Sequence, residues 1–213
     1  MALLMKQVDV LHYQFARYMD KARWMSVWHQ VAEISFCNPC MVLEVGVGSG
    51  ILGAILKNQD IYYKSVDIDP DLKPDVVALV THLPFLDASF DVVVCFQVLE
   101  HLPYEKFQMA LKELARVART KIMISLPNAR KLWCYSFYIP AYGTVRFAIP
   151  KPSLRPQKHV FDGEHFWEIG KLGYPLKKVL ADFSACHLAL EKMYRVQENP
   201  YHHFFILKPL RNR

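Results

Sequence analysis

A glycine-rich turn that follows an acidic residue is the segment of this sequence best suited to binding a small ligand. The string VLEVGVGSG, residues 42–50, places three glycines after a short apolar run. Glycine adopts positive φ readily, and without a Cβ it lets a ligand lie against the backbone. Residues 48–53 also fit the GxGxxG pattern, in which a helix N-terminus binds a pyrophosphate. Glu44, however, would repel a pyrophosphate and can instead attract an ammonium group, directly or through water.

A second acidic residue, Asp67, follows the next apolar run along the chain. It lies in the string SVDIDP, residues 65–70, after Gly50 and the helix expected there. At the end of a second strand, a carboxylate can accept hydrogen bonds from both hydroxyls of a ribose. A plain turn, with Asp69 and Pro70 beginning a loop, is the alternative. Dinucleotide enzymes share such an acid, so Asp67 predicts ribose binding without identifying the cofactor.

Alternating apolar runs and helical patterns predict the elements that position these residues. Strands are expected at 41–45, 62–67, 76–80, 91–96 and 121–126, and helices before residue 38 and at 51–57, 104–118, 164–171 and 176–183. The run DVVVCF, residues 91–96, is typical of a strand buried on both faces. Two further runs, 186–196 and 203–208, predict a C-terminal antiparallel hairpin. The pattern as a whole favours an α/β, Rossmann-like fold with helices on both faces of a mostly parallel sheet.

Two further segments make a family resemblance specific. Residues 83–103 read LPFLDASFDVVVCFQVLEHLP, and residues 125–128 read SLPN. With the two motifs above, and in this order, they resemble the class I S-adenosylmethionine-dependent methyltransferase superfamily, in the branch with LPF and VLEHL motifs. That branch includes ubiquinone-type and unassigned small-molecule methyltransferases. The resemblance covers residues 41–128 and implies a seven-stranded sheet with a reversed seventh strand. It also implies S-adenosyl-L-methionine as cofactor and S-adenosyl-L-homocysteine as product.

The resemblance also implies which residues contact the cofactor. They are Glu44, Gly46, Val47, Gly48 and Gly50 along its methionine portion, Asp67 at the ribose, Ile68, Thr81, His82 and Leu83 around the adenine, and Gln97 and Val98 at the end of the pocket. Many relatives carry an acid at the position of Leu79, where it can bind the adenine amino group. Adenine recognition here would therefore depend on backbone groups and on Thr81.

Two histidines are candidates for catalysis. His101 follows the fourth predicted strand, at the sheet edge where ligands bind, and its ordinary pKa suits a general base. The same EHL string occurs in relatives of varied chemistry, so a structural role competes. His159, with Glu164 and His165 after it, could face the acceptor, or this stretch could simply begin a helix. The spacing of the histidines, cysteines and acids indicates no metal site.

Basic residues concentrate in one region of the chain. The formal net charge is +6, and residues 114–161 contain nine Lys or Arg and no Asp or Glu. This predicts a local anionic partner. The same region is rich in aromatic residues, which could form an acceptor pocket, a partner surface or a peripheral membrane patch. The simplest interpretation is a lid packed over the active site.

One domain, residues 1–213, accounts for the whole sequence. Its expected parts are N-terminal helices at 1–38, a cofactor-binding core at 41–128, an edge excursion or lid at 129–163, and C-terminal helices with the hairpin at 164–213. The odd number of cysteines, five, and the absence of a signal-peptide pattern predict reduced thiols and a cytoplasmic protein.

The leading functional hypothesis is methyl transfer to a small-molecule acceptor, anionic or linked to a lipid or sugar. An RNA or protein methyltransferase is the alternative, because clustered basic and aromatic residues can bind nucleic acid. The chain lacks the Asn/Asp-Pro-Pro-aromatic motif of amino-directed nucleic acid enzymes, however, and reads FQVLE at residues 96–100. A non-catalytic binding protein on the same fold is a third hypothesis, and a nicotinamide dehydrogenase a weaker fourth.

Overall fold

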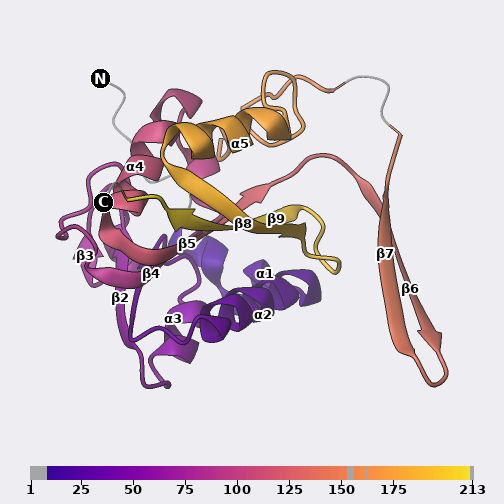
Figure 1. Cartoon of the computed structure of the whole chain (residues 1–213), viewed down its shortest axis with the longest axis horizontal. Coiled ribbons are helices and arrows are strands. Elements are labelled where there is room, and N and C mark those ends of the chain that lie inside the picture. Colours follow the sequence, from indigo (N-terminus) through magenta and orange to yellow (C-terminus); the bar gives the residue numbers. More distant parts are fainter. Residues whose placement is uncertain (1–8, 153–155, 162, 212–213) are drawn as a thin grey trace.

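A twisted sheet of seven strands, in the order β3-β2-β1-β4-β5-β9-β8, forms the centre of the molecule (Figure 1). The computed structural model describes residues 9–152, 156–161 and 163–211. The strands are β1 Met41–Val45, β2 Tyr62–Asp67, β3 Val76–Val77, β4 Phe90–Phe96, β5 Ala118–Pro127, β8 Leu188–Arg195 and β9 His202–Pro209. Strands β1 to β5 pair in parallel, whereas β9 runs antiparallel to both of its neighbours. The predicted Rossmann-like sheet with a reversed strand and a C-terminal hairpin is confirmed.

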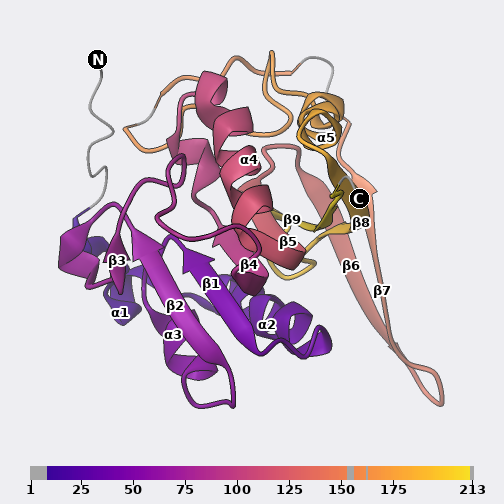
Figure 2. The same ribbon diagram turned by 60° about the vertical axis from the view of Figure 1, so that its left-hand side comes forward.

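Helices cover both faces of this sheet (Figure 2). The helices are η1 Val10–Tyr13, α1 Phe15–Tyr18, α2 Lys21–Phe36, α3 Ile51–Leu56, η2 Pro70–Leu72, η3 Leu99–His101, η4 Tyr104–Lys106, α4 Phe107–Val117 and α5 Leu176–Ala185. Ile34 of α2 and Leu56 of α3 are buried in the core of one face. Phe107 of α4 and Phe183 of α5 are buried in the core of the other face.

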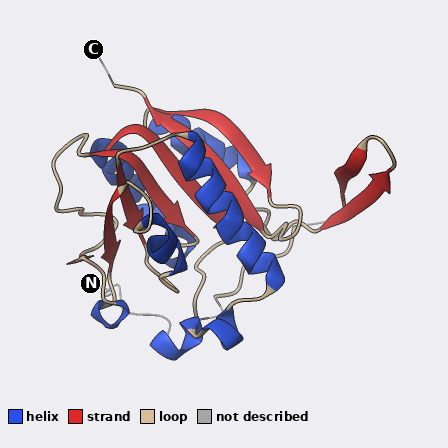
Figure 3. Ribbon diagram, turned by 90° about the horizontal axis from the view of Figure 1, so that it is seen from below, coloured by secondary structure: helices blue, strands red, loops and turns tan. Residues whose placement is uncertain are grey.

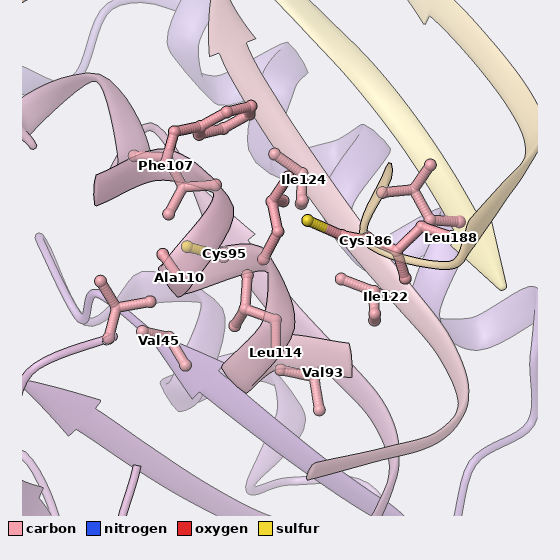
Figure 4. Close-up of a cluster of buried hydrophobic side chains, with 14 of the residues drawn as sticks. Val45, Val93, Cys95, Phe107, Ala110, Leu114, Ile122, Ile124, Cys186 and Leu188 are labelled. Carbon is pink, nitrogen blue, oxygen red and sulfur yellow. The ribbon is translucent and has the colours of Figure 1, made fainter. Parts of the chain in front are cut away.

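Strand β4 supplies side chains to both cores. Val93 and Cys95 point into the cluster beneath α4, where they meet Phe107 and Leu114 (Figure 4). Val92, on the opposite side of the strand, belongs to the core under α2 and α3. Successive side chains of a strand point to opposite faces, so a strand covered on both sides needs a continuous apolar run.

Two predicted elements differ from the structure. Residues 164–171 do not form a helix, because Ile169 pairs with the end of β5 instead. The Ile169 amide donates to the Pro127 carbonyl (3.0 Å), and the Ile169 carbonyl accepts from Ala129 (2.9 Å). The neighbouring Trp167 is fully buried, and its indole N–H donates to the Leu102 carbonyl (3.1 Å). Strand β3 is also shorter than predicted, because residues 78–80 leave the sheet to line a cavity.

The middle of the basic, aromatic region forms a separate two-stranded hairpin, β6 Leu132–Ile139 and β7 Gly143–Pro150. It projects from the body and does not pack over the sheet as the predicted lid would (Figures 1 and 3). Cross-strand ring pairs such as Tyr135 and Phe147, with centroids 5.2 Å apart, hold its strands together. Its link to the body includes the pair of Arg146 with Glu198 (2.8 Å). In the described part of the chain, no helix is long and apolar enough to cross a membrane.

The core under α4 gives a test of the fold. Replacement of the fully buried Phe107 by Ala should lower the free energy of unfolding by about 3–5 kcal/mol, through lost apolar burial and the cavity left behind. Met109→Ala, on the exposed side of the same helix, is the matched control and should change stability little. Urea denaturation followed by circular dichroism measures both, and equal losses would contradict this packing.

Candidate functional site

The glycine-rich turn begins where β1 ends and needs glycine for two separate reasons. Gly46, Gly48 and Gly50 all have positive φ, of 91°, 51° and 70°. A Cβ on Gly46 would lie 2.2 Å from Cγ2 of Val98, which is too close for any side chain. Gly50 is the N-cap of α3, so the helix starts directly after the turn. The sequence prediction that this turn needs glycine therefore has a specific steric cause at Gly46.

A cavity of about 160 Å³ lies between this turn and the carboxyl ends of β2 and β4. Six of the residues predicted to contact a cofactor line it: Gly46, Gly48, Asp67, Ile68, Gln97 and Val98. His101, one of the two predicted catalytic residues, also lines it. The carboxyl edge of a parallel sheet is where ligands bind in folds of this kind.

A smaller cavity of about 70 Å³ also borders the turn. It shares Gly46, Gly48 and Gln97 with the larger one, and Glu44 and Val47 line it as well. The two cavities therefore meet at the glycine turn, and together they contain eight of the twelve predicted cofactor residues. An elongated ligand that lies across the turn could occupy both cavities.

Asp67 connects the end of β2 to the glycine turn. Its Oδ2 accepts a hydrogen bond from the Val47 amide (2.7 Å), and its Oδ1 accepts from the Asp69 amide (2.9 Å). Burial raises the pKa of this carboxyl, while the hydrogen bonds from the backbone act in the opposite direction. Each carboxylate oxygen has a second lone pair, so Asp67 can still accept from the hydroxyls of a ligand.

Glu44 is a buried acid in the wall of the smaller cavity. The hydroxyl of Tyr63 donates to its Oε2, and Gly53 gives that hydroxyl room, since a Cβ there would lie 2.5 Å from the Tyr63 oxygen. Burial raises the pKa of Glu44 to about 8, and the hydrogen bond from Tyr63 lowers it in part. A cationic group bound next to Glu44 would favour the charged carboxylate and attract it strongly.

Four predicted cofactor residues line neither cavity. Ala78, Leu79 and Val80 line the larger cavity in place of Thr81, His82 and Leu83, because β3 ends at Val77 and the chain turns early. Leu83 faces the core, and its amide donates to Glu113 (2.9 Å). Gly50 caps α3 and lines neither cavity. The contacts of Gly50, Thr81, His82 and Leu83 with a cofactor therefore stay a prediction.

The two predicted catalytic histidines occupy different places. His101 is in the cavity wall, and its Nδ1 lies 2.9 Å from the carbonyl oxygen of Glu164. His159 lines neither cavity, and its Nε2 lies 2.7 Å from the carbonyl oxygen of His165. Next to His101, Glu100 is completely buried, which raises the pKa of its carboxyl to about 7. Of the two histidines, only His101 is placed to touch a ligand in the cavity.

Tyr13 and Tyr18, which the sequence analysis did not select, also line the larger cavity. They come from η1 and α1, and their rings meet edge to face with centroids 5.1 Å apart. The guanidinium of Arg23 lies 4.2 Å from the centre of the Tyr18 ring and donates to the Tyr18 carbonyl (2.7 Å). The aromatic residues of the N-terminal segment were visible in the sequence, but only as a pattern typical of helix packing.

Comparison with known proteins supports the fold and the central domain. Residues 43–123, from β1 to β5, match the family described as "Methyltransferase domain". An uncharacterized protein of Methanocaldococcus jannaschii is 35% identical over 86 residues, which are 38% of this chain and 37% of that protein. The match thus spans little more than a third of this relative's length.

Solved structures of similar fold cover nearly the whole chain. The 1,6-didemethyltoxoflavin-N1-methyltransferase of Burkholderia thailandensis has a TM-score of 0.61 at 15% identity, over 95% of this chain and 85% of that one. An S-adenosylmethionine-dependent methyltransferase of Clostridium acetobutylicum has a TM-score of 0.60 at 10% identity, over 94% and 96%. At these identities the likeness shows the fold. The domain match and the fold agree with the superfamily resemblance predicted from the four motifs.

The raised pKa of Glu44 predicts how stability depends on pH. The folded protein holds a proton on Glu44 up to a pKa of about 8, whereas an unfolded chain releases it near the ordinary glutamate pKa of 4.5. The unfolded state then binds fewer protons, so the free energy of unfolding should fall as pH rises from 4.5 to 8. Glu44→Gln removes this group, so its stability relative to the wild type should rise across the same window.

Thermal melts of the ligand-free protein at several pH values measure this effect. Glu105→Gln, at an exposed position, is the matched control and should follow the wild type at every pH. A constant difference between Glu44→Gln and the wild type from pH 5 to pH 8 would show that Glu44 is not protonated in the folded state.

Proposed function

We propose that this chain is a class I S-adenosylmethionine-dependent methyltransferase, which transfers a methyl group from that cofactor to a small-molecule acceptor. The observation that carries the proposal is the arrangement of Asp67 and the glycine turn beside two cavities that share residues of that turn. The larger cavity suits an adenosine and the smaller cavity a methionine chain.

The residues of the two cavities match the chemical groups of the cofactor. Asp67 would accept hydrogen bonds from the ribose hydroxyls, and Ile68, Leu72 and Leu79 offer apolar contact to an adenine. The smaller cavity has an acid, Glu44, and a base, Arg23, in its wall. An amino acid group carries one ammonium and one carboxylate, so a pair of opposite charges is the complementary set. The Gly46 turn provides the close backbone approach between the two ends.

The chain has mainly to hold two molecules in line and to exclude water. When bound, S-adenosylmethionine supplies a methyl group already activated for displacement. Most of the remaining barrier is lowered by orienting the acceptor next to that methyl group. Tyr13 and Tyr18 line the larger cavity and would help to shield the reaction from solvent. We retain His101, and not His159, as a candidate for contact with the acceptor.

The β6–β7 hairpin supports a lipid-linked or anionic acceptor. One of its faces presents only apolar and aromatic side chains, which the strand register places together: Trp133, Tyr135, Phe137, Ile139, Val145, Phe147 and Ile149. Each of these seven side chains is at least 38% exposed. Arg130, Lys131 and Lys151 lie at the base of the hairpin. Exposed aromatic side chains with flanking basic residues suit the surface of an anionic bilayer.

The hairpin is connected to the cofactor site through the loop between β8 and β9. Gln197 donates from its side chain to the Tyr135 carbonyl (2.7 Å), and Asn199 of the same loop donates to the Ser26 hydroxyl (3.2 Å). Ser26 lines the smaller cavity. A membrane-bound acceptor would therefore approach the protein from the side where the cofactor site lies.

Asp67→Asn tests the cofactor site. Loss of the charged acceptor should weaken binding of S-adenosylhomocysteine by about 1–3 kcal/mol, measured by calorimetry. Asp60→Asn, at an exposed loop position outside both cavities, should bind as the wild type does. Unchanged affinity in Asp67→Asn would mean that the ribose lies elsewhere, and no binding by the folded wild type would reject the proposed function.

The proposed role of the hairpin can be tested with vesicles. The wild type should sediment with phosphatidylglycerol vesicles, and Phe137→Ser with Phe147→Ser should reduce the bound fraction about tenfold or more, because two aromatic side chains no longer insert. Phe36→Ser removes an exposed aromatic side chain from α2 and is the control, with binding unchanged. Retention of RNA in place of vesicles would instead favour a nucleic acid acceptor.

A further inference from the structure

Two histidines and an acid from distant parts of the chain come together beside the larger cavity. Glu100, His101 and His165 each offer one possible metal-ligand atom, and these atoms lie within 4.8 Å of one another. The rings of His101 and His165 meet edge to face with centroids 5.0 Å apart. Glu100 and His101 belong to η3, directly after β4, whereas His165 lies in the irregular segment that precedes the bridge of Ile169 to Asn128.

The burial of Glu100 is an observation independent of the cluster geometry, and it also points to a bound ligand. The residue has no exposed surface, and neither of its carboxylate oxygens has a hydrogen-bond partner on another described residue. A carboxylate buried without partners is costly, and such groups in folded proteins usually pair with a cation or a donor. A metal ion bound by Glu100 and the two imidazoles would supply the missing positive charge.

The hydrogen bonds of both histidines fix which ring nitrogen can bind a metal. The Nδ1 of His101 lies 2.9 Å from a carbonyl oxygen, which can only accept, so the proton is on Nδ1 and Nε2 is basic. The Nδ1 of His165 lies 3.2 Å from Oε1 of Glu168, which also accepts from the Tyr201 hydroxyl (2.5 Å). Contacts of this kind, from a carbonyl or a carboxylate to the far ring nitrogen, orient imidazoles that bind metals.

We propose that Glu100, His101 and His165 bind a divalent first-row transition metal. Two imidazoles and one carboxylate suit Mn²⁺, Fe²⁺ or Zn²⁺, whereas Mg²⁺ and Ca²⁺ prefer sites made only of oxygen. Three protein ligands leave coordination positions for another molecule. His101 also lines the larger cavity. The next step rests on the proposed function: the ligand for the open coordination positions would be an oxygen atom of the methyl acceptor. His101 would then be a metal ligand and not the general base.

Metal titration of the whole chain without cofactor tests the site. After treatment with a chelator and its removal, the wild type should bind one equivalent of Mn²⁺ or Zn²⁺ by calorimetry. Glu100→Gln and His165→Ala should each weaken this binding at least tenfold. His187→Asn, which removes an exposed imidazole from the loop before β8, is the matched control and should leave binding unchanged. A wild type that binds no stoichiometric metal, or equal affinity in all four proteins, would overturn the proposal.

Glu100→Gln also separates loss of the site from loss of the fold. It keeps the shape of the side chain and removes a buried acid, so the melting temperature without metal should equal or exceed that of the wild type. Added metal should then raise the melting temperature of the wild type but not that of the variant. An equal rise in both proteins would overturn the proposal.

Calorimetry with S-adenosylhomocysteine on the same samples distinguishes the two proposals. Metal binding without cofactor binding would support this site and contradict methyl transfer. Cofactor binding without metal binding would overturn this site alone.

Discussion

The hydrogen bond from the Val47 amide to Asp67 is the interaction on which the site depends. It joins the turn after β1 to the end of β2, two strands that already pair in register along their length. The turn approaches the residues that follow β4 so closely that Gly46 leaves no room for a Cβ against Val98. Three neighbouring strands thus end at one point, and the two cavities form beside it. A side chain at position 46 would separate the turn from Val98 and alter both cavities.

Two acids beside this site, Glu44 and Glu100, are buried, with exposed fractions of 5% and 0%. Glu44 lines the smaller cavity, and Glu100 precedes His101, which lines the larger one. Burial of a carboxylate opposes folding unless a donor or a cation compensates it. Tyr63 provides part of that compensation for Glu44. The positions of these acids are more easily explained by what the site binds than by stability. They indicate that these buried acids lower the free energy of unfolding of the ligand-free chain, as is common at functional sites.

In the proposed function, different parts of the chain contact the cofactor and give access to the acceptor. The parallel strands carry the turn and Asp67, whereas the N-terminal segment contributes Tyr13 and Tyr18 to the wall of the larger cavity. The β6–β7 hairpin stays outside this arrangement and keeps its aromatic face exposed. Strands that alternate aromatic residues pair well with each other, so the hairpin is held by its own cross-strand contacts more than by the body.

The sequence by itself determined the alternation of strands and helices, the glycine turn and the acid at the end of β2. Each of these depends on residues close together in the chain, or on the period of a single element. Only the tertiary structure decided that residues 78–80 line the cavity, that Trp167 and Ile169 override a helical pattern, and that His165 joins Glu100 and His101. These depend on contacts between distant segments, where burial of a large side chain or pairing with a strand end outweighs local preference.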